Sequence, residues 1–359
     1  MSNTYVAIMA GGIGSRFWPE SRVNKPKQFL DILGVGKTLI QSTYDRFLKI
    51  CPQENIYIVT NETYVDLIKE QLTGILDDRI LAEPQRRNTA PCVAYVSNKI
   101  HEQNPNANLV VAPSDHIIMD EKSFSQRIET ALNFVDDSDT LITLGIKPTR
   151  PDTGYGYIQF EPGESDDEVC KVKTFTEKPD LPLAKTFVKS GDFLWNSGIF
   201  VWSTQSILRA FEMHQPEMHE IFRDGVGKYN TDQEDEFISK AYSMCTNISI
   251  DYGIMENAEN VYVIPSEFGW SDLGTWASLY ERYDKDYLGN AVNGDHVKVL
   301  DATNCMVMAP PEKLVVLQGL HKFIVIDTED VLLICEKSKE QQIKQITSDI
   351  KQEKGDDYL

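Results

Sequence analysis

The chain has 359 residues, of which 41% are hydrophobic and 25% are charged, and its formal net charge is −20. This composition is ordinary for a globular enzyme, and the negative charge argues against nucleic acid or an anionic membrane as a partner. The six cysteines lack the spacing of metal fingers or paired disulfides, and no apolar run reaches the length of a membrane span. No leader sequence is apparent, so we expect a cytoplasmic protein in a reducing compartment.

Short apolar runs alternate with helical patterns in the first half of the chain. Strands are predicted at 5–9, 55–60, 79–82, 108–112 and 140–146, and helices at 38–50, 62–74, 89–103 and 122–136. This alternation is typical of an α/β fold in which right-handed crossovers build a mostly parallel sheet. Ligands of such sheets bind beyond the carboxyl ends of the strands.

The pattern changes in the second half of the chain. It predicts antiparallel strands at 155–160 and 169–176, helices between 203 and 258, and a strand at 260–264. Evenly spaced short apolar runs then follow at 297–300, 305–308, 314–317, 323–326 and 331–335. Such runs suit a small all-β unit whose strands stack as turns of a β-helix, closed by a polar helix at 337–354. We therefore expect two domains, 1–285 and 286–359.

The segment from Ala10 to Leu30 directly follows the first predicted strand. Gly11, Gly12 and Gly14 let the backbone turn tightly and approach a ligand, and successive bare N–H groups make an anion cradle. Four cations follow against the single acid Glu20: Arg16, Arg22, Lys25 and Lys27. A strand, a glycine loop and clustered cations together predict a polyphosphate site.

Two familiar phosphate motifs do not fit this segment. The dinucleotide fingerprint needs a third glycine where Phe17 stands, and a P-loop ending in Gly36-Lys37-Thr38 would need a glycine at Asp31. The remaining pattern, G-G-x-G-x-R-F-x-P-x(6)-P-K, resembles the signature of the sugar-1-phosphate nucleotidyltransferases. Its Lys-Gln-Phe-Leu ending resembles the mannose-1-phosphate guanylyltransferase branch of that family.

The resemblance carries expectations about fold and activity. It implies a Rossmann-like, GT-A-like nucleotidyltransferase domain followed by a short left-handed β-helix that helps to form a homodimer. It also implies transfer of GMP from GTP to mannose 1-phosphate, which gives GDP-mannose and pyrophosphate. Longer members carry a fused isomerase domain; the residues after Lys285 hold no His-Glu metal cluster, so we expect that activity to be absent.

Further segments match the same family. The segment from Glu83 to Pro91 resembles its base-recognition segment, with Arg86 where members more often have glycine. Asn88 offers the donor and acceptor that a guanine edge requires, and it could equally cap the helix that follows. The nucleotide contacts implied by the resemblance come from Gly11, Gly12, Gly14, Ser15, Gln85, Asn88 and Ser114.

Two aspartates lie in family-matching segments. The resemblance implies that Asp115, after the strand at 108–112, and Asp272, in the segment 270–276, hold Mg²⁺ (or Mn²⁺), a hard cation that prefers oxygen ligands. Local sequence leaves alternatives open, a turn role for Asp115 and a helix N-cap for Asp272. His116 is expected to be structural, because this reaction needs no strong base.

The sugar-phosphate pocket is implied by the segments 175–179 and 195–200. Read without the resemblance, the first of these is a strand end with a surface ion pair. The implied contacts come from Gly156, Glu177, Lys178, Asn196, Gly198 and Asp251. Carboxylate and amide groups can hydrogen-bond sugar hydroxyls, and the ammonium of Lys178 suits a phosphate.

A phosphate monoester is already a competent nucleophile, so direct in-line attack on the α-phosphorus requires no Ser, Cys or His nucleophile. Catalysis then consists of positioning and charge neutralisation, for which we expect Arg16, Lys27 and Lys178 to be the catalytic residues. Two alternatives stay open, another NDP-sugar pyrophosphorylase and a non-catalytic regulatory subunit that senses nucleotide sugars.

Overall fold

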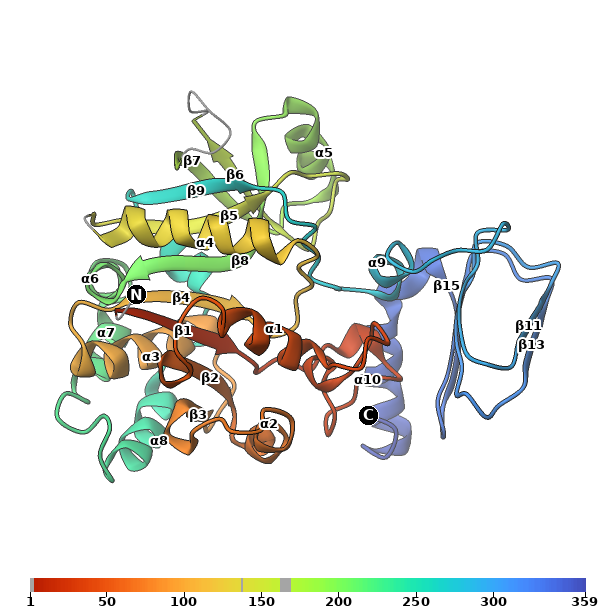
Figure 1. The fold of residues 1–359 in the computed structure, drawn as a ribbon, viewed down its shortest axis with the longest axis horizontal. Coiled ribbons are helices and arrows are strands. Elements are labelled where there is room, and N and C mark those ends of the chain that lie inside the picture. Colours follow the sequence, from red (N-terminus) through yellow and green to blue (C-terminus); the bar gives the residue numbers. More distant parts are fainter. Residues whose placement is uncertain (1–2, 137, 162–168) are drawn as a thin grey trace. The chain divides into compact units, whose positions relative to one another are not determined.

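Nine strands of the described residues form one mixed sheet (Figure 1). The computed structural model describes residues 3–136, 138–161 and 169–359. The strands lie in the order β3-β2-β1-β4-β8-β5-β9-β7-β6. Their bounds are β1 (Thr4–Met9), β2 (Ile56–Asn61), β3 (Ile80–Glu83), β4 (Asn108–Pro113), β5 (Leu141–Ile146), β6 (Gly156–Phe160), β7 (Cys170–Glu177), β8 (Phe193–Ser203) and β9 (Val261–Ser266).

The strands predicted in the first half are confirmed to within one or two residues. β1 pairs in parallel with β2 and with β4, and β2 pairs in parallel with β3. The backbone N–H of Ser114 donates to the carbonyl of Met9 at 3.0 Å. The carboxyl ends of β1 and β4 are therefore side by side, as the alternation of strands and helices predicted.

β8 is the strand of this sheet that was not predicted from the sequence. It runs antiparallel between β4 and β5, and β6 and β7 are antiparallel as well, so the sheet is mixed rather than mostly parallel. The turn-forming residues Asn196-Ser197-Gly198 interrupt its apolar pattern, and Gly198 has a φ of +71°. The pairing with β5 shifts register between Thr143 and Gly145, which is typical of a β-bulge.

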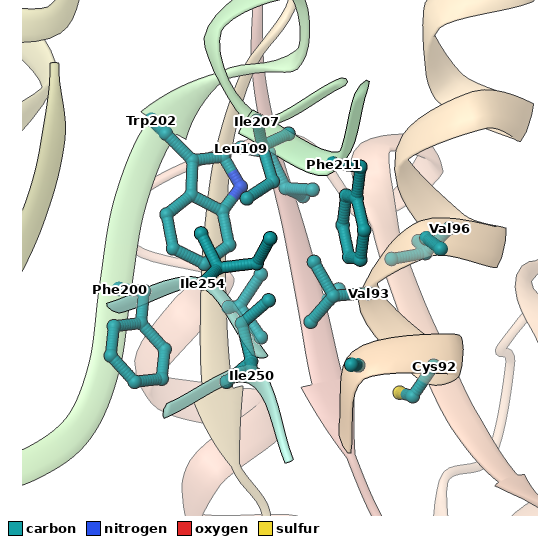
Figure 2. Packing of buried hydrophobic residues seen from close by; sticks show 14 of the residues in the cluster. Cys92, Val93, Val96, Leu109, Phe200, Trp202, Ile207, Phe211, Ile250 and Ile254 are labelled. Atoms are coloured by element: carbon teal, nitrogen blue, oxygen red, sulfur yellow. The ribbon is translucent and has the colours of Figure 1, made fainter. Parts of the chain in front are cut away.

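Helices cover the sheet. Residues of α3 and α6 pack with Leu109 of β4 and Trp202 of β8 in one continuous core (Figure 2). α4 packs against β4, β5, β8 and β9, and its buried side chains are not part of that core. Alternate residues of a strand face opposite sides of the sheet, so the same strands supply side chains to both packing faces. The helix bounds are α1 (Leu39–Phe47), α2 (Val65–Gln71), α3 (Thr89–Gln103), α4 (Glu121–Asp136), α5 (Leu181–Ser190), α6 (Thr204–His214), α7 (Pro216–Arg223) and α8 (Glu234–Met244).

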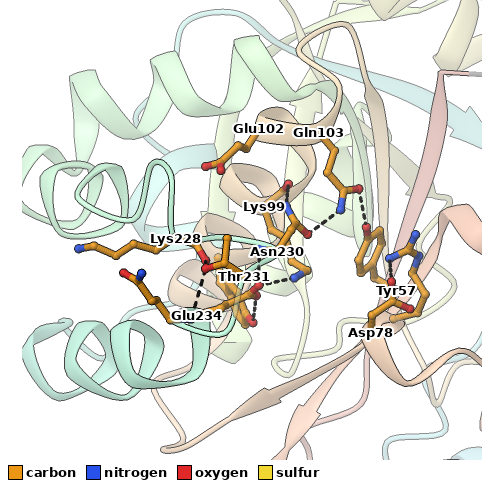
Figure 3. A network of polar contacts seen from close by, with 12 residues as sticks. Tyr57, Asp78, Lys99, Glu102, Gln103, Lys228, Asn230, Thr231 and Glu234 are labelled. Atoms are coloured by element: carbon orange, nitrogen blue, oxygen red, sulfur yellow. Dashed lines mark hydrogen bonds and ion pairs between the residues drawn. The ribbon is translucent and has the colours of Figure 1, made fainter.

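A buried polar network holds α8 against α3 (Figure 3). The Nζ of Lys99 lies 2.5 Å from Oε2 of Glu234, whose Oε1 accepts a hydrogen bond from the hydroxyl of Tyr95 at 2.6 Å. Both side chains of the ion pair are less than one tenth exposed, so losing either partner would leave an uncompensated buried charge. The network thereby fixes the helix that carries Tyr242.

The chain forms two compact units. Unit 1 consists of Met1–Gly11, Gln41–Ser114 and Ile118–Trp270, and unit 2 of Gly12–Ile40, Asp115–Ile117 and Ser271–Leu359. Unit 2 therefore contains most of the glycine loop and both aspartates singled out as metal ligands. The domain boundary expected after residue 285 stays a prediction.

The short strands of unit 2 stack as expected for a β-helix. β10, β12 and β14 pair in parallel in one small sheet that β15 closes in antiparallel fashion, and β11 pairs in parallel with β13 in another. The bounds are β10 (Ala291–Asn293), β11 (Val297–Leu300), β12 (Met306–Met308), β13 (Val315–Gln318), β14 (Phe323–Asp327), β15 (Leu332–Glu336), α9 (Trp276–Tyr280) and α10 (Ile343–Lys354).

One hydrophobic cluster joins the distant segments of unit 2. The rings of Phe17 and Trp276 lie 4.9 Å apart, and Leu273 and Ile343 are fully buried in the same cluster. The indole N–H of Trp276 donates to the carbonyl of Trp18 at 3.2 Å. The turn after the first strand is thus packed against residues from the end of the chain.

Replacing Phe211 by alanine should test the core of unit 1. The ring is 1% exposed, so Phe211→Ala should lower the free energy of unfolding by about 3–5 kcal/mol. Met213 of the same helix is 58% exposed, and Met213→Ala is the matched control, with a change within about 0.5 kcal/mol. Urea denaturation of both variants measures the difference, and equal losses would contradict the described packing.

Candidate active site

The glycine loop continues into a short 3₁₀ turn that presents Arg16. Gly14 has a φ of +70°, and a Cβ there would lie 2.5 Å from Cβ of Lys27. Only glycine accommodates both this conformation and this close approach. The turn Ser15–Phe17 then buries Phe17 and leaves Arg16 exposed.

Lys27 is the central cation of unit 2. Its Nζ lies 2.7 Å from Oδ2 of Asp115 and donates to the carbonyls of Asp272 at 2.6 Å and Leu273 at 3.1 Å. The residue is 3% exposed. Burial by itself would raise the pKa of Asp115, but the Lys27 ammonium and, less strongly, His116 hold that pKa below its ordinary value. Asp115 is therefore an anion in this site.

An isolated antiparallel bridge brings the two predicted metal ligands into one region. The N–H of Ile117 donates to the carbonyl of Ser271 at 2.8 Å, and the N–H of Ser271 donates back at 3.1 Å. Oδ1 of Asp272 accepts from the N–H of Gly274 at 3.0 Å. The N-cap of α9 is Thr275, whose side chain accepts from Ser278, so the alternative in which Asp272 caps this helix is wrong.

These residues line a cavity of about 310 Å³ that lies wholly within unit 2. Six predicted site residues line it: Gly14, Ser15, Arg16, Lys27, Asp115 and Asp272. Lys344, which the sequence analysis did not single out, lines it too. Its only sequence signal was its place in the charged helix predicted at 337–354.

The other two cations of the loop lie elsewhere. Nη1 of Arg22 is 2.7 Å from Oδ2 of Asp330, and Lys25 lines a different cavity of about 710 Å³. The four cations predicted to form one polyphosphate site are therefore divided, and only Arg16 and Lys27 line the cavity that holds the aspartates.

The base-recognition segment belongs to unit 1. Asn88 is the N-cap of α3, and its Oδ1 accepts from the N–H of Thr89 at 3.0 Å, which confirms the capping alternative. Its side chain and that of Gln85 are exposed, and Oε1 of Gln85 accepts from Arg87 at 2.9 Å. Ser114 is only 2% exposed, and its contact with the nucleotide stays a prediction.

Glu83 is a buried carboxyl that the sequence analysis named only as the start of this segment. Its Oε1 accepts from the hydroxyl of Tyr242 at 2.9 Å, and a Cβ on Gly11 would lie 3.4 Å from its Oε2. Burial raises the pKa of Glu83 to about 7, although the hydrogen bond from Tyr242 opposes the shift. Nothing in the sequence around Glu83 indicated that this carboxyl would be buried.

The structure brings the predicted sugar-phosphate residues together, all within unit 1. Nδ2 of Asn196 donates to Oδ1 of Asp251 at 2.8 Å, and Nζ of Lys178 lies 2.5 Å from Oε1 of Glu177. A Cβ on Gly156 would lie 2.5 Å from Oε2 of Glu177 and 3.3 Å from Cβ of Asn196, so a larger residue there would displace the Glu177 carboxylate.

Electrostatics distinguish the two acids of this group. Burial raises the pKa of Asp251 to about 7, and the nearby Glu177 carboxylate adds to the shift. Burial opposes protonation of Lys178, but its hydrogen bond to Glu177 raises the pKa of the ammonium overall. Near neutral pH, Asp251 is therefore partly protonated, and it lies near the Glu177–Lys178 ion pair.

The described residues hold no cluster of three or more His, Cys, Asp or Glu side chains arranged to bind a metal ion. Within the same part of the chain, none of the helices has the length and apolar character needed to cross a membrane.

Two family models match this chain. Residues 5–287 match the model described as Nucleotidyl transferase, and residues 294–350 match the MannoseP isomerase/GMP-like beta-helix domain. The stacked strands of unit 2 agree with the second match.

Named relatives resemble the chain over nearly its full length. It is 35% identical to a mannose-1-phosphate guanylyltransferase of Escherichia coli, over 94% of this chain and 74% of that protein. It is also 35% identical to the alginate biosynthesis protein AlgA of Pseudomonas aeruginosa, over 96% of this chain and 71% of that protein.

A solved structure is similar as well. A protein of Thermus thermophilus, described as a mannose-1-phosphate geranyltransferase, superposes with a TM-score of 0.87 at 29% identity, covering 97% of this chain and 99% of that one. The resemblance expected from the glycine loop is thus confirmed, and the chain belongs to the nucleotidyl transferase family, with a β-helix of the MannoseP isomerase/GMP-like kind after its first domain.

Proposed function

We propose that this protein transfers GMP from GTP to mannose 1-phosphate, giving GDP-mannose and pyrophosphate. The observation that carries the proposal is the cavity in which Arg16 and Lys27 meet Asp115 and Asp272. The identity of the base and sugar follows from the mannose-1-phosphate guanylyltransferase that the chain resembles. A homodimer and a cytoplasmic location accompany the proposal as predictions.

The chemistry requires two polyanions to approach each other. A phosphate oxygen of mannose 1-phosphate attacks the α-phosphorus of GTP in line with the bond to the leaving pyrophosphate, and no covalent enzyme intermediate forms. Arg16 is exposed in the cavity and neutralises the β- and γ-phosphates, while the exposed Lys178 binds the sugar phosphate. Lys27 acts indirectly: its buried ammonium orients the carboxylate of Asp115 and the backbone of Asp272.

The donor set of the cavity fits a hard divalent cation. Asp115 and Asp272 supply carboxylate oxygens to one space, and Mg²⁺ in proteins is commonly held by one or two carboxylates together with substrate phosphates. These two residues would hold Mg²⁺ (or Mn²⁺), which would add Lewis-acid neutralisation of phosphate oxygens. Fewer than three protein carboxylates suffice for such a site.

The unit 1 groups suit the neutral parts of the substrates. Glu177, Asn196 and Asp251 offer acceptors and, when Asp251 is protonated, a donor to sugar hydroxyls. Oε2 of Glu83 lies near Gly11 and is an acceptor that matches an N–H donor of guanine, while Oε1 accepts from Tyr242.

Pyrophosphate release across a grid of substrates tests the proposed reaction. GTP, UTP, ATP, CTP and dTTP would each be combined with the 1-phosphates of mannose, glucose, N-acetylglucosamine and fucose. We expect a maximum at GTP with mannose 1-phosphate that EDTA abolishes and added Mg²⁺ restores. A maximum elsewhere would identify another NDP-sugar pyrophosphorylase, and no release from any pair would contradict an enzymatic role.

Removing the exposed cation should lower turnover without disturbing the fold. Arg16→Ala is expected to reduce kcat by about 10²–10³, the usual cost of losing one electrostatic donor. Lys27→Ala should reduce it at least as much, since it also leaves the buried Asp115 unpaired. Lys25→Ala, from the same loop but lining another cavity, is the control. Wild-type turnover by folded Arg16→Ala protein would contradict the assigned role.

Titration of Asp251 should appear in the stability of unit 1. The pKa of Asp251 is about 7 in the folded state and 3.8 ordinarily. Between pH 4 and pH 7 the folded state therefore binds more protons than the unfolded state. The free energy of unfolding falls as the pH rises through this range. Asp251→Asn, which stays neutral, should therefore gain unfolding free energy relative to wild type from about pH 4 to 7 and level off above.

Urea unfolding at several pH values measures this difference. Asp232→Asn, which changes an exposed aspartate of the same unit, is the matched control. A constant difference between wild type and Asp251→Asn from pH 4 to pH 8 would contradict the raised pKa.

A further inference from the structure

The cavity that holds Arg16 contains a second exposed cation from the end of the chain. Lys344, the second residue of α10, lines this cavity together with Arg16, Lys27, Asp115 and Asp272. It lies more than 300 residues after Arg16, and none of the motifs singled out in the sequence includes it, although the β-helix family model that matches residues 294–350 spans it.

Several contacts within unit 2 fix α10 beside the turn that presents Arg16. Ile343 is fully buried in the cluster that contains Phe17, and the indole N–H of Trp18 donates to the carbonyl of Tyr358 at 2.7 Å. Just before α10, Oε2 of Glu340 accepts from the N–H of Ala277 at 2.8 Å. Lys344 is therefore carried to the cavity by an anchored helix rather than by a loose terminus.

The cations that line the cavity differ in whether they have an ion-pair partner. The ammonium of Lys27 is occupied by Asp115 and two carbonyls. Among the described residues, neither Arg16 nor Lys344 forms an ion pair, whereas Lys351 of the same helix lies 2.7 Å from Asp356. Two unpaired cations at one cavity, beside two carboxylates, leave a positive site suited to adjacent phosphate groups.

We propose that Lys344 binds the β- and γ-phosphates of the nucleotide, and the pyrophosphate they become, together with Arg16. The inference rests on the proposed function and adds a residue of the β-helix segment to its phosphate site. Lys344 contributes charge only: it forms no covalent bond and transfers no proton. In this proposal α10 both packs against the turn that presents Arg16 and supplies a phosphate-binding side chain.

Steady-state kinetics of conservative variants test this role. Lys344→Gln should raise the KM for GTP in synthesis and for pyrophosphate in the reverse reaction by about tenfold, the effect of one charge-assisted contact in a partly exposed site. The KM for mannose 1-phosphate should change little. Lys344→Arg keeps the charge and should recover most of the affinity. Lys354→Gln, in the last turn of the same helix, is the control.

Direct titration with inorganic pyrophosphate and Mg²⁺ separates this inference from the proposed reaction, because it needs no turnover. Calorimetry should show weaker binding by Lys344→Gln than by wild type, Lys344→Arg or Lys354→Gln, all with unchanged circular dichroism. If no substrate pair reacts but this order of binding holds, the proposed reaction is wrong and the anion site stands. Equal binding by Lys344→Gln and wild type, or no binding by wild type, would overturn the role of Lys344.

Discussion

The buried ammonium of Lys27 is the contact on which the arrangement of the candidate active site depends. One nitrogen contacts the carboxylate of Asp115 and the carbonyls of Asp272 and Leu273, and so joins three segments of unit 2 that are distant in the sequence. The side chain is 4% exposed, so water cannot replace these partners without local opening. The absent Cβ of Gly14 gives the lysine stem its space.

Lys27 and Arg16 differ in how much of their charge is available to a ligand. The donors of Lys27 are occupied by protein oxygens, so it positions the carboxylate of Asp115 and the backbone of Asp272, and it offers little charge to an incoming phosphate. Arg16, which lines the same cavity, forms no ion pair among the described residues and is exposed. We therefore propose different roles for two cations that are neighbours in one sequence motif, because one is buried and the other is not.

Much of the fold could be predicted from local pattern. Period-two apolar runs and helical spacing placed α3 at its observed bounds and β11 likewise, because each element buries side chains that its own sequence displays. β8 was missed because Asn196-Ser197-Gly198 reads as a turn while forming the irregular centre of a long strand. The insertion of that strand between β4 and β5 is a long-range pairing, on which local periodicity carries no information.

The site could be predicted where a motif supplied all its members, and less well where the fold brings separate segments together. The glycine loop indicated Arg16 and Lys27 correctly as residues of one cavity. Local sequence allowed Asp272 to be a helix cap, and only the bridge between Ile117 and Ser271, with Thr275 as the observed cap, distinguishes the two arrangements. Glu83 and Lys344 carry no motif, because burial beside Tyr242 and docking of α10 are properties of the tertiary structure.

Cations without an ion-pair partner, rather than the number of cations, distinguish the proposed phosphate site in this acidic protein. A net charge of −20 distributed over the surface is screened over about 8 Å at physiological salt, so the field at a cavity is set by its own neighbours. Elsewhere cations are neutralised locally, as Lys99 is by Glu234 and Arg22 by Asp330. The cations counted along the loop therefore included Arg22, which is paired with Asp330, and they did not include Lys344 near the far end of the chain. Pairing, which depends on the fold, decides which cations remain available to an anion.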